Sequence, residues 1–111
     1  MKREEVLGIL GKHRNELRSE YHVKSLALFG SVARNEAANT SDVDLLVEFD
    51  QPVGLFHLAG TELFIRELLG VEKVDLIIRD SVFKELRETI YGEAIDVIRS
   101  PTVEISPSAH S

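Results

Sequence analysis

Hydrophobic residues recur along the chain with two different spacings, one typical of helices and one typical of strands. From Lys2 to about Ser19 the apolar positions lie three to seven residues apart, which predicts one helical face. This face consists of Val6, Leu10, His13 and Leu17. A second helical pattern runs from Leu55 to Leu69 and stops at Gly70, a common helix terminator. Shorter helices are expected over residues 32–37 and 82–91.

Four other stretches are short, apolar and bounded by turn residues, which is typical of strands. They cover residues 22–29, 42–50, 73–79 and 94–99. In the second of these stretches apolar and mixed positions alternate, so that one face is uniformly apolar and the other carries acids. The apolar face consists of Val43, Leu45, Val47 and Phe49. Alternating strands and helices predict an α/β or α+β domain with a small sheet covered by helices.

The length of 111 residues leaves room for one domain with one modest core. We expect this domain to cover residues 1–99. Residues 100–111 contain two prolines and four serines with little to bury, which predicts a loose tail. No apolar run approaches the roughly 20 residues of a membrane span, and the N-terminus lacks the apolar segment of a signal peptide. These features predict a cytoplasmic protein that does not enter membranes.

Charge and cysteine content narrow the chemistry. The formal net charge is −6 and the pI is about 5.2, which disfavours a protein that covers a nucleic-acid backbone. No stable nucleic-acid binding is therefore expected. Cysteine is absent, so a metal ion must be held by oxygen atoms or by histidine. This preference points toward hard cations such as Mg²⁺.

The pair Gly30-Ser31 follows the first predicted strand and precedes a predicted short helix. Backbone N–H groups at such a turn are suited to hold an anion, and glycine lets a phosphate approach the backbone closely. Ser31 adds a hydroxyl donor, and Arg34 lies about one helical turn further on. The simpler interpretation is a turn glycine followed by a capping serine, with Arg34 facing solvent. Alone, these three residues leave both interpretations open.

Two acids, Asp42 and Asp44, lie at alternate positions of the second predicted strand. Residues two apart on a strand project to one face with Cα atoms about 6.6 Å apart, so their carboxylates can converge on a metal ion. The alternatives would be a solvent-facing edge strand, or Asp42 serving only as a turn acid. Asp75 is embedded in the third predicted strand, "KVDLII", and would join this face if the two strands were neighbours. Three carboxylates gathered in this way repel one another and are suited to divalent cations.

Together these residues resemble the minimal nucleotidyltransferases of the polymerase-beta-like superfamily. The resemblance is carried by the segments "FGSVAR" and "SDVDLLVEF" and by the later single acid. It implies an α+β nucleotidyltransferase fold, with a small mixed sheet whose helices pack mainly on one face. It also implies the following site residues. Asp42, Asp44 and Asp75 would be catalytic and hold two Mg²⁺ ions, whereas Gly30, Ser31 and Arg34 would bind the nucleotide.

Asn35 departs from this family's pattern, because many members carry glycine after the arginine. The metal acids are untouched by this departure, so we expect activity to be retained.

The resemblance further implies a reaction and a partner. Free-standing members resemble antitoxins that transfer AMP from ATP to a tyrosine hydroxyl of a HEPN-type ribonuclease toxin, releasing pyrophosphate. A chain of this length has no separate acceptor domain, which fits an acceptor presented by such a partner. Two alternatives remain open: an enzyme acting on a small molecule such as an aminoglycoside, and a non-catalytic antitoxin that acts by binding. A homodimer and a hetero-oligomer with the toxin are also both open.

The helix predicted from Leu55 to Leu69 bears on the partner. One apolar stripe can pack on the sheet, and a second, formed by Phe56, Ala59 and Leu63, lies on another side. The second stripe would be covered either by loops of the same chain or by a partner.

Overall fold

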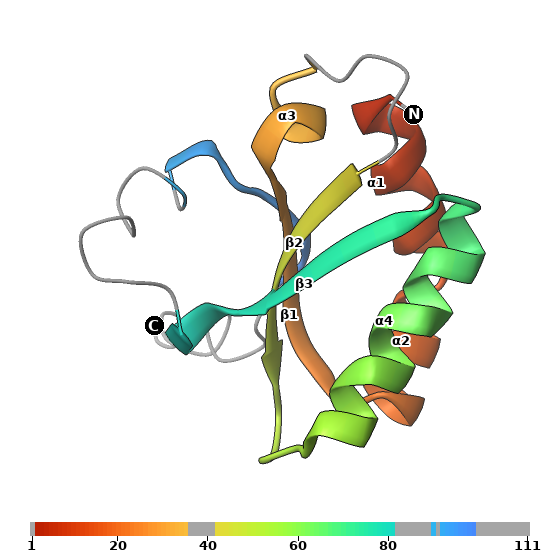
Figure 1. Ribbon diagram of the computed structural model, residues 1–111, viewed down its shortest axis with the longest axis vertical. Coiled ribbons are helices and arrows are strands. Elements are labelled where there is room, and N and C mark those ends of the chain that lie inside the picture. Colours follow the sequence, from red (N-terminus) through yellow and green to blue (C-terminus); the bar gives the residue numbers. More distant parts are fainter. Residues whose placement is uncertain (1, 36–41, 82–89, 91, 100–111) are drawn as a thin grey trace, which may run out of the picture.

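The computed structural model describes residues 2–35, 42–81, 90 and 92–99 (Figure 1). The expected tail and most of the helix expected over 82–91 lie outside these residues. The helices are α1 (Arg3–Lys12), α2 (Arg14–Glu20), α3 (Gly30–Ala33) and α4 (Leu55–Leu69), with a 3₁₀ turn at Arg79–Ser81. The strands are β1 (Val23–Phe29), β2 (Asp42–Phe49), β3 (Lys73–Ile78) and β4 (Ile95–Ile98). In the described part of the chain, no helix has the length and hydrophobicity of a membrane span.

The four strands form one mixed sheet in the order β3-β2-β1-β4. β1 pairs antiparallel with both β2 and β4, whereas β2 and β3 run parallel. The parallel pair requires a crossover connection, and α4 supplies it between the two strands. Because β2 and β3 are parallel, both strands begin at the same end of the sheet, as Figure 1 shows.

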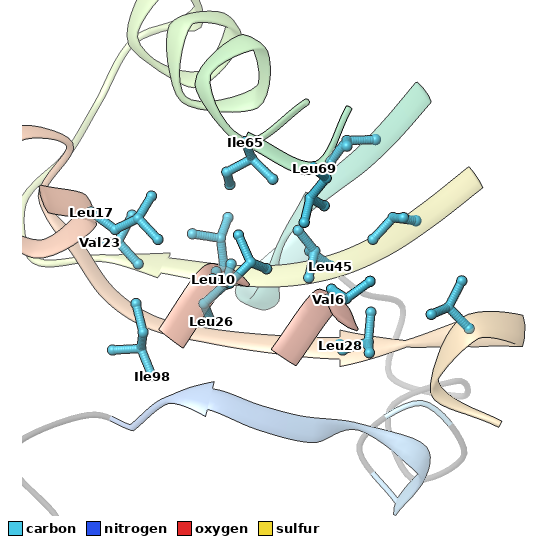
Figure 2. Packing of buried hydrophobic residues seen from close by; sticks show 14 of the residues in the cluster. Val6, Leu10, Leu17, Val23, Leu26, Leu28, Leu45, Ile65, Leu69 and Ile98 are labelled. Atoms are coloured by element: carbon cyan, nitrogen blue, oxygen red, sulfur yellow. The ribbon is translucent and has the colours of Figure 1, made fainter. Parts of the chain in front are cut away.

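Three helices cover one face of the sheet. α1, α2 and α4 lie together on this side in Figure 1, and α4 ends at Gly70 in the left-handed conformation (φ 67°). The core between these helices and the sheet is mainly apolar (Figure 2), and Thr61 of α4 is also fully buried. Its residues include Val6, Leu10, Leu17, Leu26, Leu28, Val43, Leu45, Val47, Ile65 and Leu69. The predicted mixed sheet with helices mainly on one face is confirmed, as is the alternation predicted for β2.

A smaller apolar cluster lies on the opposite face of the sheet. Ala27 of β1 and Leu46 of β2 are fully buried there, and Ile77 of β3 packs against them. Side chains alternate between faces along a strand, so Asp44 and Asp75 project on the same side as this cluster. The candidate carboxylates therefore lie on the face opposite the three helices.

Two predicted helices differ in their bounds. The single helix expected from Lys2 to Ser19 is two helices, because the backbone turns at His13, where φ is −103°. The N–H of His13 bonds to the carbonyl of Leu10, three residues back, which interrupts the regular ladder. The short helix expected from residue 32 begins at Gly30 and ends at Ala33. The last predicted strand is confirmed as β4.

Candidate active site

Asp44 and Asp75 lie side by side at the centre of the candidate site. The register of the parallel pair sets Asp44 of β2 opposite Asp75 of β3, and Asp44 also pairs with Phe29 at the end of β1. Both carboxylates are half-buried. The structure therefore brings together two acids that are thirty-one residues apart in sequence, as the sequence predicted for adjacent strands.

A second facing pair, Asp42 and Lys73, lies two residues earlier on the two strands, at the N-terminal ends of β2 and β3. These residues are opposite each other in the same register, and both are exposed. The Nζ atom of Lys73 lies 3.9 Å from Oδ2 of Asp75, within ion-pair distance. Lys73 was missed by the sequence reasoning, although its position two residues before Asp75 already placed it on the same face. The site thus holds three carboxylates and one ammonium group.

The pKa of Asp44 is raised above its ordinary value. Partial burial of the carboxyl group is the main cause, followed by the charge of Asp75, a hydrogen bond with Asp75 and the charge of Asp42. The ammonium group of Lys73 acts in the opposite direction. A carboxylate that is crowded by others in this way gains from a nearby cation.

Gly30 backs directly against the carboxylate of Asp44. Its φ is +79°, a conformation that side chains rarely adopt. A Cβ atom at Gly30 would overlap Oδ2 of Asp44 and would lie 3.0 Å from its Cγ. The glycine is therefore required both by the backbone turn and by the acid. The two halves of the predicted site, the anion loop and the acid pair, are in direct contact.

The other two predicted nucleotide-binding residues follow Gly30 in the same short helix and its cap. Ser31 is half-buried, and Arg34 is exposed. Nη1 of Arg34 donates to Oε1 of Glu93 at 2.9 Å, an ion pair between the end of α3 and the residues before β4. Arg34 therefore has an acidic partner in the metal-free chain, which the sequence alone did not indicate.

The backbone conformation of Asn35 accounts for the residue type at this position. Its φ is +62°, in the left-handed region. Glycine adopts this conformation without cost, and asparagine is among the side chains that tolerate it best. Asn35 thus satisfies the same backbone requirement as the glycine that it replaces.

The carboxylates of the site are suited to a hard cation such as Mg²⁺. In the described ranges, no three histidine or acidic side chains are arranged as a ready-made metal cluster. Mg²⁺ is commonly held by one or two carboxylates together with substrate phosphates, and Asp44 and Asp75 supply such a pair. Gly30 lets the carboxylate of Asp44 lie directly against the backbone, where any side chain would displace it. These residues fit one hard cation, with Asp42 one row further toward the edge.

A hollow at the other end of the sheet is separate from the acids. It has a volume of about 480 Å³ and is lined by Phe49, Gln51, Ile78 and Asp80, among others. Glu48 is the lining residue of β2 nearest to Asp44, and it lies four positions further along the strand, which corresponds to roughly 13 Å. A ligand confined to this hollow would not contact Asp44 or Asp75. The candidate catalytic site is therefore the group of Asp42, Asp44 and Asp75.

The match to a known family agrees with this geometry. The sequence model of the family described as "Nucleotidyltransferase domain" matches residues 10–98. The chain belongs to the nucleotidyltransferase domain family. This match spans β1, β2 and β3 and so includes every residue of the candidate site. The predicted nucleotidyltransferase and its fold are confirmed.

Relatives of known sequence and structure extend the comparison. Protein adenylyltransferase MntA of Thermococcus cleftensis is 36% identical over 94 residues, covering 85% of this chain and 94% of the relative. A solved structure described as a candidate minimal nucleotidyltransferase is 36% identical, with a TM-score of 0.71, and covers 86% of this chain and 95% of the other. The fold also matches a chain in the complex of a tri-AMPylated HEPN toxin of Shewanella oneidensis with an MNT antitoxin. That match has 14% identity, a TM-score of 0.61, and coverage of 88% and 76%.

Proposed function

We propose that this protein transfers AMP from ATP to a tyrosine hydroxyl of a HEPN-type ribonuclease toxin and thereby inactivates it as an antitoxin. The observation that carries the proposal is the lateral pairing of Asp44 with Asp75, with Gly30 packed against Asp44. The relationship to a protein adenylyltransferase supports AMP transfer to a protein. The fold shared with an antitoxin that is bound to an AMPylated toxin supports the partner.

Each site residue has a role in this proposal. Asp44 and Asp75 would hold Mg²⁺, and Asp42 would complete the set for a second ion. Bound Mg²⁺ would activate the acceptor hydroxyl and neutralise charge on the triphosphate. Asp75 lies beside Asp44 at the edge of the sheet, so it can accept the proton of the tyrosine hydroxyl. The new bond joins the tyrosine oxygen to the α-phosphorus, and pyrophosphate leaves.

The phosphates of ATP are assigned to the loop that begins at Gly30. Backbone N–H groups at the start of α3, beside the carboxylate of Asp44, would donate to a phosphate oxygen. The Ser31 hydroxyl is a further donor. Arg34 would exchange its ion pair with Glu93 for a phosphate oxygen, which is a stronger partner because it carries more charge.

The surface of α4 supports a protein acceptor. In the part of the chain that the structure describes, the large hydrophobic side chains with high exposure are all on this helix. Leu55, Phe56 and Leu63 are 83%, 96% and 44% exposed. Among the described residues, the second apolar stripe predicted from the sequence, Phe56, Ala59 and Leu63, is exposed. A contiguous apolar stripe on an acidic protein suits a partner with an apolar face and basic surroundings.

An assay with labelled ATP tests the proposal. The protein is incubated with Mg²⁺, ATP labelled on the α-phosphate, and a HEPN-type ribonuclease from the same genome. We expect label on a toxin tyrosine, located by mass spectrometry, and loss of ribonuclease activity. Asp44→Asn should abolish both effects. If no label is transferred while wild type and Asp44→Asn suppress the ribonuclease equally, the protein acts by binding and the proposal is wrong. Labelling of an aminoglycoside instead would favour a small-molecule enzyme.

A further inference from the structure

Lys73 places a positive charge inside the row of acids. It is the first residue of β3, in register with Asp42 and two residues before Asp75 on the same face. Its Nζ atom lies 3.9 Å from Oδ2 of Asp75. The side chain is 59% exposed, so its ammonium group is accessible to a ligand that binds beside Asp75.

This ammonium group has opposite effects on two ligands. It repels a divalent cation that approaches Asp75 and competes with it for the same carboxylate oxygen. It attracts the phosphates of a nucleotide bound at the neighbouring Gly30 loop. The three acids and Lys73 together carry two net negative charges, which one divalent cation neutralises. A second cation then requires the negative charge of a triphosphate.

We propose that Lys73 makes the site selective for a complex of metal ion and nucleoside triphosphate over the bare metal ion. This inference rests on the proposed function, because it assumes that metal and nucleotide bind at Asp44 and Gly30. In the absence of nucleotide, Lys73 is the counter-ion of Asp75. When the nucleotide binds, the ammonium group turns to its phosphates and leaves Asp75 to the metal. Binding of metal is thereby coupled to binding of substrate.

Binding measurements with Mn²⁺ test this coupling without any catalysis. Mn²⁺ affinity is measured by electron paramagnetic resonance and calorimetry, alone and with a non-hydrolysable ATP analogue. For Lys73→Gln we expect Mn²⁺ alone to bind roughly three- to tenfold more tightly and the Mn²⁺–nucleotide complex about tenfold more weakly. Lys73→Arg keeps the charge, so both affinities should stay within about twofold of wild type. Both differences should shrink at high salt.

Lys24→Gln is the matched control, because it also removes one lysine charge but lies on β1, at the end of the sheet away from the acids. Lys24 lines the distant hollow near the start of β1, whereas Asp44 pairs with Phe29 at the end of that strand. It should alter neither affinity by more than about twofold. The inference is overturned if Lys73→Gln matches Lys24→Gln, or if it weakens free and nucleotide-bound Mn²⁺ equally, as a structural role would. Lys73→Met is measured in parallel, so that a folding defect of one variant does not decide the result. If wild type binds neither Mn²⁺ nor its nucleotide complex, the proposed function fails instead.

Discussion

Asp44 and Asp75 are direct neighbours across the parallel pair β2–β3, and the carboxyl group of Asp75 helps to raise the pKa of Asp44. The acids repel each other while both are ionised, so the metal-free site is destabilising for the folded chain. A site that is costly without its ligand is expected where binding or catalysis has selected the residues. The repulsion can be measured separately from any activity.

Replacing Asp44 with asparagine should therefore stabilise the metal-free protein. Partial burial first, and then Asp75, raise the folded-state pKa of this carboxyl group above its unfolded value. The stability that belongs to the protonated group is complete below the unfolded pKa and is lost as pH rises through the folded pKa. At about pH 7 the Asp44→Asn variant should gain on the order of 0.5 kcal/mol in free energy of unfolding over wild type. The gain should vanish in acid, below the ordinary aspartate pKa.

Denaturant unfolding in the presence of a chelator measures this difference at each pH. When Mg²⁺ and a non-hydrolysable ATP analogue are added, wild type should become the more stable of the two proteins. The ligands stabilise wild type by mass action, whereas the binding site of the variant lacks one carboxylate. Asp80→Asn is a suitable control, since Asp80 is exposed at the far end of β3. An Asp44→Asn variant that is less stable than wild type at neutral pH without ligands would show that the acids do not repel.

The placement of the candidate acids on their strands could be predicted from the sequence because it depends on local rules. Alternation along β2 placed Asp42 and Asp44 on one face, and Gly70 ended α4 at the expected residue. The lateral partner of Asp44 could be foreseen only on the condition that β2 and β3 are neighbours. That condition depends on the crossover through α4 and on the order of strands, which no local pattern encodes.

The features that sequence reasoning missed are contacts between distant segments. Glu93 is fifty-nine residues from Arg34, and nothing in its surroundings marks it as the partner of an arginine. The counter-ion role of Lys73 depends on the register that sets it beside Asp42. The break at His13 also escaped prediction, because the apolar spacing continues across it into α2.

Gly30→Ala should separate folding from activity. The added Cβ would overlap the carboxylate of Asp44, and alanine resists the positive φ of this residue. The carboxylate can rotate away, so we expect a loss of about 1–2 kcal/mol in unfolding free energy and a folded chain. The displaced acid should lower the rate of AMP transfer roughly 10²-fold or more. Gly8→Ala on α1 is the matched control, since a Cβ there meets nothing within 4 Å. Equal activity of the two variants would contradict contact between the glycine loop and the acid.

Asn35 should tolerate glycine and reject branched side chains. Its φ of +62° suits both asparagine and glycine, whereas a β-branched residue is strained there. Asn35→Gly should change the free energy of unfolding by no more than about 0.5 kcal/mol, and Asn35→Val should lower it by about 1–2 kcal/mol. Thermal or urea unfolding of both variants measures the difference. Equal stability of the two would mean that position 35 leaves the left-handed conformation in solution.

The exposed stripe of α4 should be required for binding the acceptor protein but not for binding metal and nucleotide. Phe56 is 96% exposed and Leu63 is 44% exposed, so polar substitutions there cost little folding free energy. Phe56→Ser combined with Leu63→Ser should weaken the complex with the labelled toxin at least roughly tenfold, since buried aromatic anchors dominate interfaces. Calorimetry measures this affinity, and binding of Mn²⁺ with the ATP analogue should be unchanged. Asn15→Ser, on the exposed side of α2, is the control and should leave the complex intact. An unchanged toxin affinity in the double variant would place the docking surface elsewhere on the molecule.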